Sequence, residues 1–207
     1  GNLKSATGNR YGFQLTFFRR RIIPLDSENK WPTPASAWRT GQIYLAHAAL
    51  SDLDGKQHFY AQDMGRGVLG IAGEFRDNDA VRIFLKKWSA RIGPHTHRLK
   101  VMSDPFSFDL NLTAVKPAVL HGKNGYSQKG STPERASCYY SLTRLETEGQ
   151  VTLFKKTFAV SGLSWMDHEF STALLEPGIE GWDWFSLQLS DRTEIMLFLL
   201  RKDDGGV

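Results

Sequence analysis

Cysteine is nearly absent from this sequence, since Cys138 is the single thiol among 207 residues. An internal disulfide is therefore impossible, which suits either the cytoplasm or a disulfide-free exported protein. Long apolar runs are also missing, because no stretch approaches the roughly 20 residues that a membrane-spanning helix needs. A chain of this length can still bury a substantial core without a disulfide or a metal ion. We therefore expect a globular protein with no integral membrane segment.

A large excess of charge of one sign is missing as well. The sequence has 26 Lys and Arg against 22 Asp and Glu, a formal net charge of +4. Its basic residues form short clusters, Arg19-Arg20-Arg21 and Lys86-Lys87, whereas a nucleic-acid surface needs a longer basic stripe. We expect the arginine cluster to close a strand and face water. Nucleic acid is therefore not an expected partner.

Several motifs of catalytic chemistry are missing. The sequence has no Gly-rich loop before a helix to hold phosphate, and no G-x-S-x-G turn to present a nucleophilic serine. It has no Cys/His cluster with zinc spacing, and His168 with Asp167 or Glu169 lacks that spacing too. His95 and His97 lie on a polar turn, where we expect them to be solvated. We therefore expect no metal site and no cofactor.

What the sequence does have is alternation of apolar and polar residues with a period of two. The clearest examples are residues 11–17, 43–49 and 106–113, and turn signals such as Leu53-Asp54-Gly55 separate such runs. This alternation is typical of half-buried strands. About nine or ten antiparallel strands in meander order predict an all-β barrel or a strongly bent sheet.

Four segments need separate interpretation. Residues 194–201 form a nearly continuous apolar strand. Residues 81–92 also suit one face of a helix, but we interpret them as a strand because Val81, Ile83 and Leu85 alternate. Residues 24–40 and 118–135 are predicted to be long loops, and loops of this length inside a β domain often carry function.

The most unusual stretch places Asp167, His168 and Glu169 between Trp165 and the pair Trp182 and Trp184. In an extended strand, Trp165, Asp167 and Glu169 share one face, and Met166, His168 and Phe170 share the other. The second face is the more apolar, so we expect His168 to point into the barrel. Two carboxylates in a dry site would favour protonation of one, which could then act as a general acid. The alternative is a structural hydrogen-bond network with a satisfied core histidine.

Other side chains are candidates for binding a ligand. Tyr126 and Lys129 lie in the loop NGYSQKG and could orient a polar group, although Tyr126 could instead simply pack that turn. Tyr139 and Tyr140 point to opposite faces of a strand, so at most one lines an interior. The substrate-binding candidates are Trp165, Trp182, Trp184, Tyr126, Lys129, Tyr139 and His47, and the catalytic candidates are Asp167, His168 and Glu169. This aromatic content suits an apolar small-molecule pocket, and equally a well-filled core.

Six runs, in order, resemble the carotenoid 1,2-hydratase (hydroxyneurosporene synthase) family and its AttH-like relatives: YGFQLTFFRR, WRTGQIYLAHAALSD, NGYSQKG, YYSLTRL, SGLSWMDHEFST and GWDWFSLQLSD. The resemblance covers nearly the whole chain. It implies two lipocalin-like (calycin) antiparallel β-barrel domains in tandem. Residues 1–207 would then be most of the N-terminal barrel, with its first strand and the second barrel missing. The ends agree, because we expect Gly1–Leu3 to lie within a hairpin and residues 203–206 to form a turn before another strand.

The named enzymes of that family add water to an isolated carbon–carbon double bond of an isoprenoid, while more distant relatives shape polyketide cycloadditions. The resemblance therefore implies an apolar, isoprenoid-like ligand. Protonation of an unactivated alkene needs a well-placed acid, and aromatic faces can stabilise the cation. Asp167 is the expected acid, with His168 or Glu169 tuning it or taking the proton back, beside the three tryptophans. A non-catalytic binding module and a secreted hydrolase are the alternatives. Family members imply export, although no signal peptide is visible.

Overall fold

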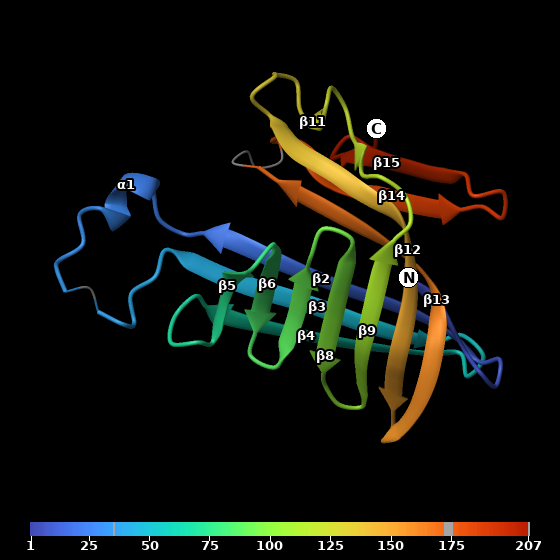
Figure 1. Cartoon of the computed structure of the whole chain (residues 1–207). Coiled ribbons are helices and arrows are strands. Elements are labelled where there is room, and N and C mark those ends of the chain that lie inside the picture. The colour runs from blue at the N-terminus through green and yellow to red at the C-terminus, as the bar shows by residue number, and fades with distance from the viewer. Residues whose placement is uncertain (35, 172–175, 207) are drawn as a thin grey trace. The chain divides into compact units, whose positions relative to one another are not determined.

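The computed structural model describes residues 1–34, 36–171 and 176–206, and it is almost wholly antiparallel β structure (Figure 1). Within the described residues the helical structure is one short helix, α1 (Leu25–Glu28). The chain divides into two compact units. Unit 1 comprises Gly1–Thr113 and Glu146–Leu163, and unit 2 comprises Ala114–Leu145 and Ser164–Val207. The all-β fold class expected from the period-two pattern is confirmed, as is the lipocalin-like fold that the family resemblance implies.

Unit 1 is built on a strongly curved sheet that has the strand order β4-β3-β2-β1-β13-β12-β9-β8-β7-β6-β5. Contacts of β3 and β4 with β6 bring the two ends of this order together, so that the sheet forms a nearly closed barrel. Two ion pairs of 2.5 Å, Lys86–Asp63 and Arg19–Glu74, join the same ends. The strands of the sheet are β1 (Asn2–Ser5), β2 (Arg10–Arg21), β3 (Gln42–Asp52), β4 (Gln57–Arg66), β5 (Ala72–Asp77), β6 (Ala80–Leu85), β7 (Trp88–Ile92), β8 (Thr96–Met102), β9 (Phe106–Ala114), β12 (Ala136–Leu153) and β13 (Lys156–Phe170).

The alternation in the sequence decides which side chains enter the core of unit 1. Along β3, alternate residues from Tyr44 to Leu50 are buried, and along β9 alternate residues from Phe106 to Leu112 are buried. Gly1–Leu3 does lie at a hairpin, because β1 pairs with β2 through Asn2↔Gly12. The arginine cluster ends β2 and is exposed, as predicted.

Three expectations for unit 1 are wrong. Residues 81–92 are not one strand, because Lys86 turns the backbone with a φ of 52° and β6 and β7 pair as a hairpin. The order is not a simple meander, since β1 lies beside β13 and β12 beside β9. His97 is not solvated: it lies in β8 with its side chain turned to the core, and it is 4% exposed. Its two ring nitrogens have no hydrogen-bond partner, and burial lowers its pKa.

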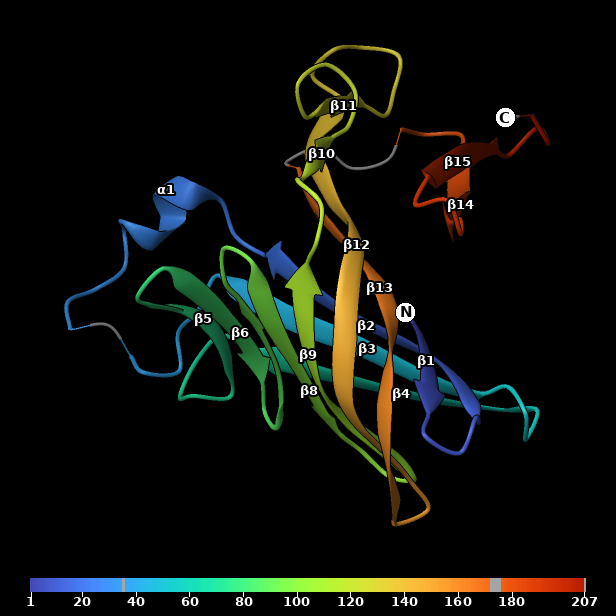
Figure 2. The same cartoon turned by 45° about the vertical axis from the view of Figure 1, so that its right-hand side comes forward.

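Unit 2 contains the remaining part of β12 and β13, together with β10 (Val119–Leu120), β11 (Tyr126–Gln128), β14 (Ile179–Gln188) and β15 (Glu194–Lys202). The predicted loop 118–135 thus carries two short strands, and both pair with β12, through Val119↔Ser141 and Tyr126↔Cys138 (Figure 2). The predicted strand 194–201 is confirmed as β15, which forms a hairpin with β14.

A buried ion pair ties this hairpin to β12 within unit 2. The Nε of Arg144 on β12 donates to Oε1 of Glu194 at 2.6 Å, and the Nζ of Lys116 lies 2.5 Å from Oε2 of the same carboxylate. Arg144 also donates to the carbonyl of Leu189 at 3.0 Å. Burial opposes ionisation of Glu194, but the two basic partners prevail and lower its pKa. The start of β15 is therefore fixed against β12.

In the part of the chain that the structure describes, no helix has the length and apolar character needed to cross a membrane.

Candidate functional site

In unit 2, residues 136–145 of β12 and 164–170 of β13 bring the predicted acid Asp167 together with a set of hydrogen-bond donors. Oδ1 of Asp167 accepts hydrogen bonds from Ser141 Oγ at 2.5 Å, Tyr139 Oη at 3.1 Å and Trp165 Nε1 at 2.9 Å. Trp165 and Asp167 share a face of β13 because side chains alternate along a strand. Tyr139 and Ser141 share the matching face of β12 for the same reason. Three donors converge on one oxygen, and the second oxygen, Oδ2, takes no part in these contacts.

Aromatic rings surround this carboxylate. Trp165 and Trp184 meet edge to face with centroids 6.1 Å apart, and the indole N–H of Trp184 donates to the Tyr139 hydroxyl at 3.3 Å. Tyr139 is 4% exposed. Burial, followed by the negative charge of Asp167, raises the pKa of Tyr139 to about 12. The phenol therefore stays neutral near pH 7 and keeps its proton for the carboxylate.

His121 and Ser141 belong to the same cluster, and the sequence analysis missed both. His121 Nε2 lies 2.6 Å from Ser141 Oγ, and the imidazole packs on the Tyr139 ring with centroids 4.2 Å apart. The backbone N–H of His121 donates to the Tyr139 carbonyl at 3.1 Å, which anchors the residue directly after β10. Burial lowers the pKa of His121, although the charge of Asp167 opposes the shift.

Glu169 has a separate partner. Its carboxylate lies 3.1 Å from the ammonium of Lys129 and accepts a 2.5 Å hydrogen bond from Ser137 Oγ. The Lys129 ammonium also lies over two aromatic rings, 4.8 Å from the centroid of Tyr139 and 4.3 Å from that of Phe198. The two carboxylates of the motif therefore do not share one proton, because Glu169 is held by a lysine while Asp167 is held by neutral donors.

His168 is on the opposite face from Asp167, so the expectation that it points into an interior is wrong. Its Nδ1 lies 3.0 Å from the hydroxyl of Tyr140, and its ring contacts Tyr140 and the 57% exposed Phe170. The sequence pattern misled because the more apolar face of this strand end is not the one that meets buried partners. The face with Asp167 meets the buried Tyr139 and Ser141 of β12 instead. The predicted opposition of Tyr139 and Tyr140 is confirmed.

The other candidates do not join the cluster. Tyr126 donates to the carbonyl of Pro133 and closes its own loop, with 47% of the residue exposed. Trp182 is 57% exposed on β14. His47 lies in unit 1, where its ring packs edge to face against Phe18 and Tyr60 at 5.2 and 5.9 Å. Of the ten candidates, the structure brings six together: Asp167, and around or beside it Trp165, Trp184, Tyr139, Lys129 and Glu169.

Asp167 is more exposed than the sequence suggested. The residue is exposed on β13, although the expected contact with a tryptophan is confirmed by the hydrogen bond from Trp165. No group of three or more His, Cys, Asp or Glu side chains that could hold a metal ion is found among the described residues.

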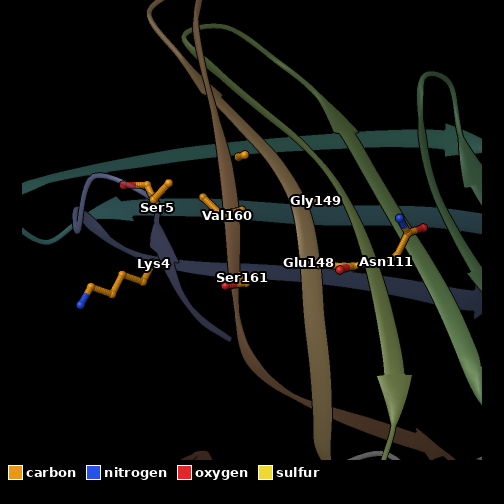
Figure 3. A pocket seen from close by; sticks show the side chains of 9 residues that line it. Lys4, Ser5, Asn111, Glu148, Gly149, Val160 and Ser161 are labelled. Atoms are coloured by element: carbon orange, nitrogen blue, oxygen red, sulfur yellow. The ribbon is translucent and has the colours of Figure 1, made fainter.

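A separate hollow lies on unit 1 and has a volume of about 470 Å³ (Figure 3). Backbone and side chains of β1, β9, β12 and β13 line it, among them Lys4, Asn111, Glu148 and Ser161. None of the ten candidates lines this hollow. It therefore adds nothing to the Asp167 cluster, whose chemistry has to be argued from its own contacts.

The direction of the hydrogen bonds determines what the cluster can do. An ionised carboxylate can only accept, so the Ser141 proton points to Asp167 and the Ser141 oxygen accepts from His121. In a serine nucleophile the hydroxyl donates to the histidine, and the histidine donates to the acid. Here Ser141 lies between His121 and Asp167, and its side chain is fully buried. The arrangement suits proton transfer at Asp167, not attack by Ser141.

Comparison with known proteins gives a consistent family and fold. A family model described as AttH-like matches residues 1–207. The chain is similar to the solved structure of a protein from Nitrosomonas europaea assigned as an AttH, with 30% identity and a TM-score of 0.83 over 100% of this chain and 60% of that one. Kievitone hydratase from Nectria haematococca is also similar, with 15% identity and a TM-score of 0.59 over 99% of this chain and 60% of that one. At this identity the second likeness concerns the fold alone. The search of curated proteins found no match. The chain spans 60% of the length of both solved relatives.

Proposed function

This chain belongs to the AttH-like family, whose model matches it from end to end. We propose that residues 1–207 are part of a longer protein, here called the parent. We propose that the parent is a hydratase, which adds water to a carbon–carbon double bond of an apolar, isoprenoid-like molecule. The observation that carries the proposal is the convergence of Ser141, Tyr139 and Trp165 on one oxygen of Asp167 beside the Trp184 ring. A carboxyl group with one oxygen engaged and the other available is suited to giving a proton to a bound molecule.

The reaction starts with Asp167 in its protonated form, with the proton on Oδ2. The π electrons of the alkene form a new C–H bond with this proton, and the O–H bond electrons remain on the carboxylate. The three donors to Oδ1 then stabilise the negative charge that has appeared. Donors aimed at a charge that develops during the reaction lower the barrier more than they stabilise the ground state.

The carbocation forms at the more substituted carbon, where it can lie against aromatic faces. Trp165, Trp184 and the ring of Tyr139 supply such faces. Water then attacks the cation and gives up a proton to surrounding water, so Asp167 has to take up a new proton before the next turnover. His168 is on the other side of the strand and Glu169 is paired with Lys129, so neither is placed for the role that the sequence suggested.

The proposed role of Asp167 is tested by Asp167→Asn in the full-length parent. Asn keeps the shape but has no acidic proton, so turnover of a test panel of isoprenoid olefins should be lost. Binding, followed by quenching of tryptophan fluorescence, should stay within about tenfold, or about 1.4 kcal/mol. Glu169→Gln is the matched control, since it removes the neighbouring carboxylate and leaves the Asp167 donors in place. If Asp167→Asn turns over at the parental rate, Asp167 is structural and the proposal fails.

A non-catalytic binding module is the second candidate, and the exposure of Asp167 favours it. Three neutral donors would hold a structural carboxylate equally well. In that case the parent binds apolar molecules but converts none. A hydrolase has no comparable support, because Ser141 is buried and its proton points away from His121.

We also propose that the rest of the parent chain forms a second barrel and that the parent is exported. The first part is supported by the 60% coverage of the solved relatives, and the second by the family resemblance alone. Limited proteolysis of the parent, and fractionation of cells that produce it, test the two parts separately.

A further inference from the structure

Only one of the three donors to Asp167 leads onward to a group that can change its charge near neutral pH. The indole of Trp165 donates but cannot accept, so proton transfer ends there. The Tyr139 hydroxyl has a pKa of about 12 and so keeps its proton near neutral pH. The group that donates a hydrogen bond to it is the indole N–H of Trp184. The Ser141 hydroxyl is different, because it connects to the imidazole of His121. Histidine is the side chain whose ordinary pKa lies near neutrality.

The geometry points to His121 as the residue that exchanges the proton of Asp167 with water, through Ser141, during the hydration proposed above. The two steps of the path measure 2.6 Å from His121 Nε2 to Ser141 Oγ and 2.5 Å from Ser141 Oγ to Asp167 Oδ1. This inference rests on the proposed function for its purpose, but the hydrogen-bond path itself does not. His121 does not touch the reacting carbon and is a positioning and proton-delivery residue.

The transfer balances without any further reactant. The Nε2–H bond of a protonated His121 breaks as a new bond forms to Ser141 Oγ. At the same time the original Ser141 O–H bond breaks, and its proton binds Asp167 Oδ1. A half-turn of the carboxyl group about its Cβ–Cγ bond then exchanges the places of the two oxygens, so that the proton faces the alkene. His121 is left neutral with its proton on Nδ1, Ser141 is unchanged, and Asp167 is an acid again. Once Asp167 has given its proton away and Ser141 donates to it again, exchange with water removes the Nδ1 proton and returns one to Nε2, which restores the resting imidazole. A further proton from water then binds Nδ1, and no electrons pass to or from an oxidant.

The burial along the path explains why such a relay would be needed. Asp167 is exposed, so in the free protein it can exchange protons directly with water. An apolar molecule bound beside Oδ2 would cover that side. Ser141, which is 0% exposed, lies on the other side of the carboxylate and leads to the half-buried His121. The path therefore reaches Asp167 at Oδ1, and a substrate bound beside Oδ2 does not block it.

Several charged or titratable groups act on His121, and they set its response to pH. Asp167 and Glu169 favour the protonated ring, while Lys129 and burial disfavour it. Tyr139 packs against the ring but stays neutral. Removing the Asp167 charge should therefore lower the pKa of His121, whereas a histidine that lies far from the carboxylate would show no such change.

The test uses the full-length parent labelled with ¹⁵N-histidine and observed by nuclear magnetic resonance. The His121 signals are identified by their loss in His121→Gln, and by backbone-directed assignment if that variant does not fold. In the unsubstituted protein at pH 8, neutral His121 should carry its proton on Nε2, because Ser141 must give its own proton to Asp167. In Asp167→Asn the midpoint of His121 protonation should fall by about one pH unit. His168, which follows Asp167 in sequence but lies on the opposite face, is the internal control and should shift less.

Two results would overturn the inference: a His121 ring protonated on Nδ1, or a His121 midpoint that is the same with Asp167 and with Asn at this position. Both are measured without substrate. A parent that shows the predicted tautomer and coupling but hydrates no olefin therefore refutes the proposed function and leaves the path intact. A parent that hydrates olefins while neutral His121 is protonated on Nδ1 in the substrate-free protein refutes the path and leaves the proposed function intact. With a turned-over olefin, His121→Gln should slow the later turnovers more than the first, because reloading of Asp167 depends on the ring.

Discussion

Tyr139 and Tyr140 are adjacent tyrosines with opposite surroundings, and replacing each by Phe gives a matched test of the Asp167 cluster. Tyr139→Phe removes a hydroxyl that donates to Asp167 and accepts from Trp184. Tyr140→Phe removes a hydroxyl that bonds to His168 on the exposed face. Both variants keep the ring, so the change in the core volume is small.

The expected magnitudes differ because one bond ends on a carboxylate. A hydrogen bond to a charged group contributes about 1.5–3 kcal/mol, and a neutral one about 0.5–1.5 kcal/mol. Water can partly replace the lost donor, because Asp167 is exposed, so we expect about 1.5 kcal/mol for Tyr139→Phe. We expect about 0.5 kcal/mol for Tyr140→Phe, whose partner His168 is also exposed.

The assay is urea unfolding of the full-length parent, followed by tryptophan fluorescence, since Trp165 and Trp184 lie at the cluster. Tyr139→Phe should lower the midpoint clearly more than Tyr140→Phe does. Equal effects, or a larger effect of Tyr140→Phe, would refute the claim that the Tyr139 face holds the polar network.

Further predictions concern pH, the buried ion pair and the exposed apolar surface. The folded-state pKa of Tyr139, about 12, exceeds its ordinary value of about 10, so its contribution to stability should be complete below pH 10 and be lost between pH 10 and 12; Tyr139→Phe should lack this loss in a pH series of unfolding curves. Glu194→Gln leaves Arg144 buried with a neutral partner and should destabilise the parent by about 3–5 kcal/mol in urea unfolding; the exposed pair Arg10–Asp54 supplies the control, and an equally small effect for both pairs would contradict the structural role of Glu194. Because burial is outweighed by Lys116 and Arg144, the lowered pKa of Glu194 means that this stability is present near neutral pH and is lost as the pH falls through the folded-state value. Residues 1–207 on their own should associate, because Phe185 and Leu197 on paired strands are 54% and 53% exposed; light scattering that shows a monomer at high concentration would contradict this, and Phe185→Lys should reduce the association.

The period of two was enough to predict the fold class and the two faces of the strand end at Asp167. It placed Trp165 with Asp167 and separated Tyr139 from Tyr140, because alternation is a local property of an extended chain. It also misplaced His168, since the more apolar face was taken to be the inner one. Here the face that meets buried partners is the polar and aromatic one with Asp167, and Phe170 on the other face is 57% exposed.

What the sequence could not supply was pairing between distant segments. His121 follows a two-residue strand in a predicted loop, and its approach to Ser141 depends on the register of β10 with β12. The turn at Lys86 was missed because lysine carries no turn signal of its own, although its φ is positive. His97 looked like a turn residue, but pairing with β7 and β9 buries it. Each of these outcomes depends on contacts between strands, which alternation along one strand does not encode.

The central claim is that Asp167 gives a proton to a carbon atom and that water then adds to the neighbouring carbon. The most direct measurement incubates the full-length parent with the isoprenoid olefin panel in D₂O enriched in ¹⁸O and analyses the products by mass spectrometry and nuclear magnetic resonance. The account predicts a product with one deuterium on carbon and one ¹⁸O on the adjacent carbon, formed by the parent and by Glu169→Gln but not by Asp167→Asn. Olefins that bind and quench tryptophan fluorescence yet are recovered without either label would contradict it and identify the parent as a binding protein.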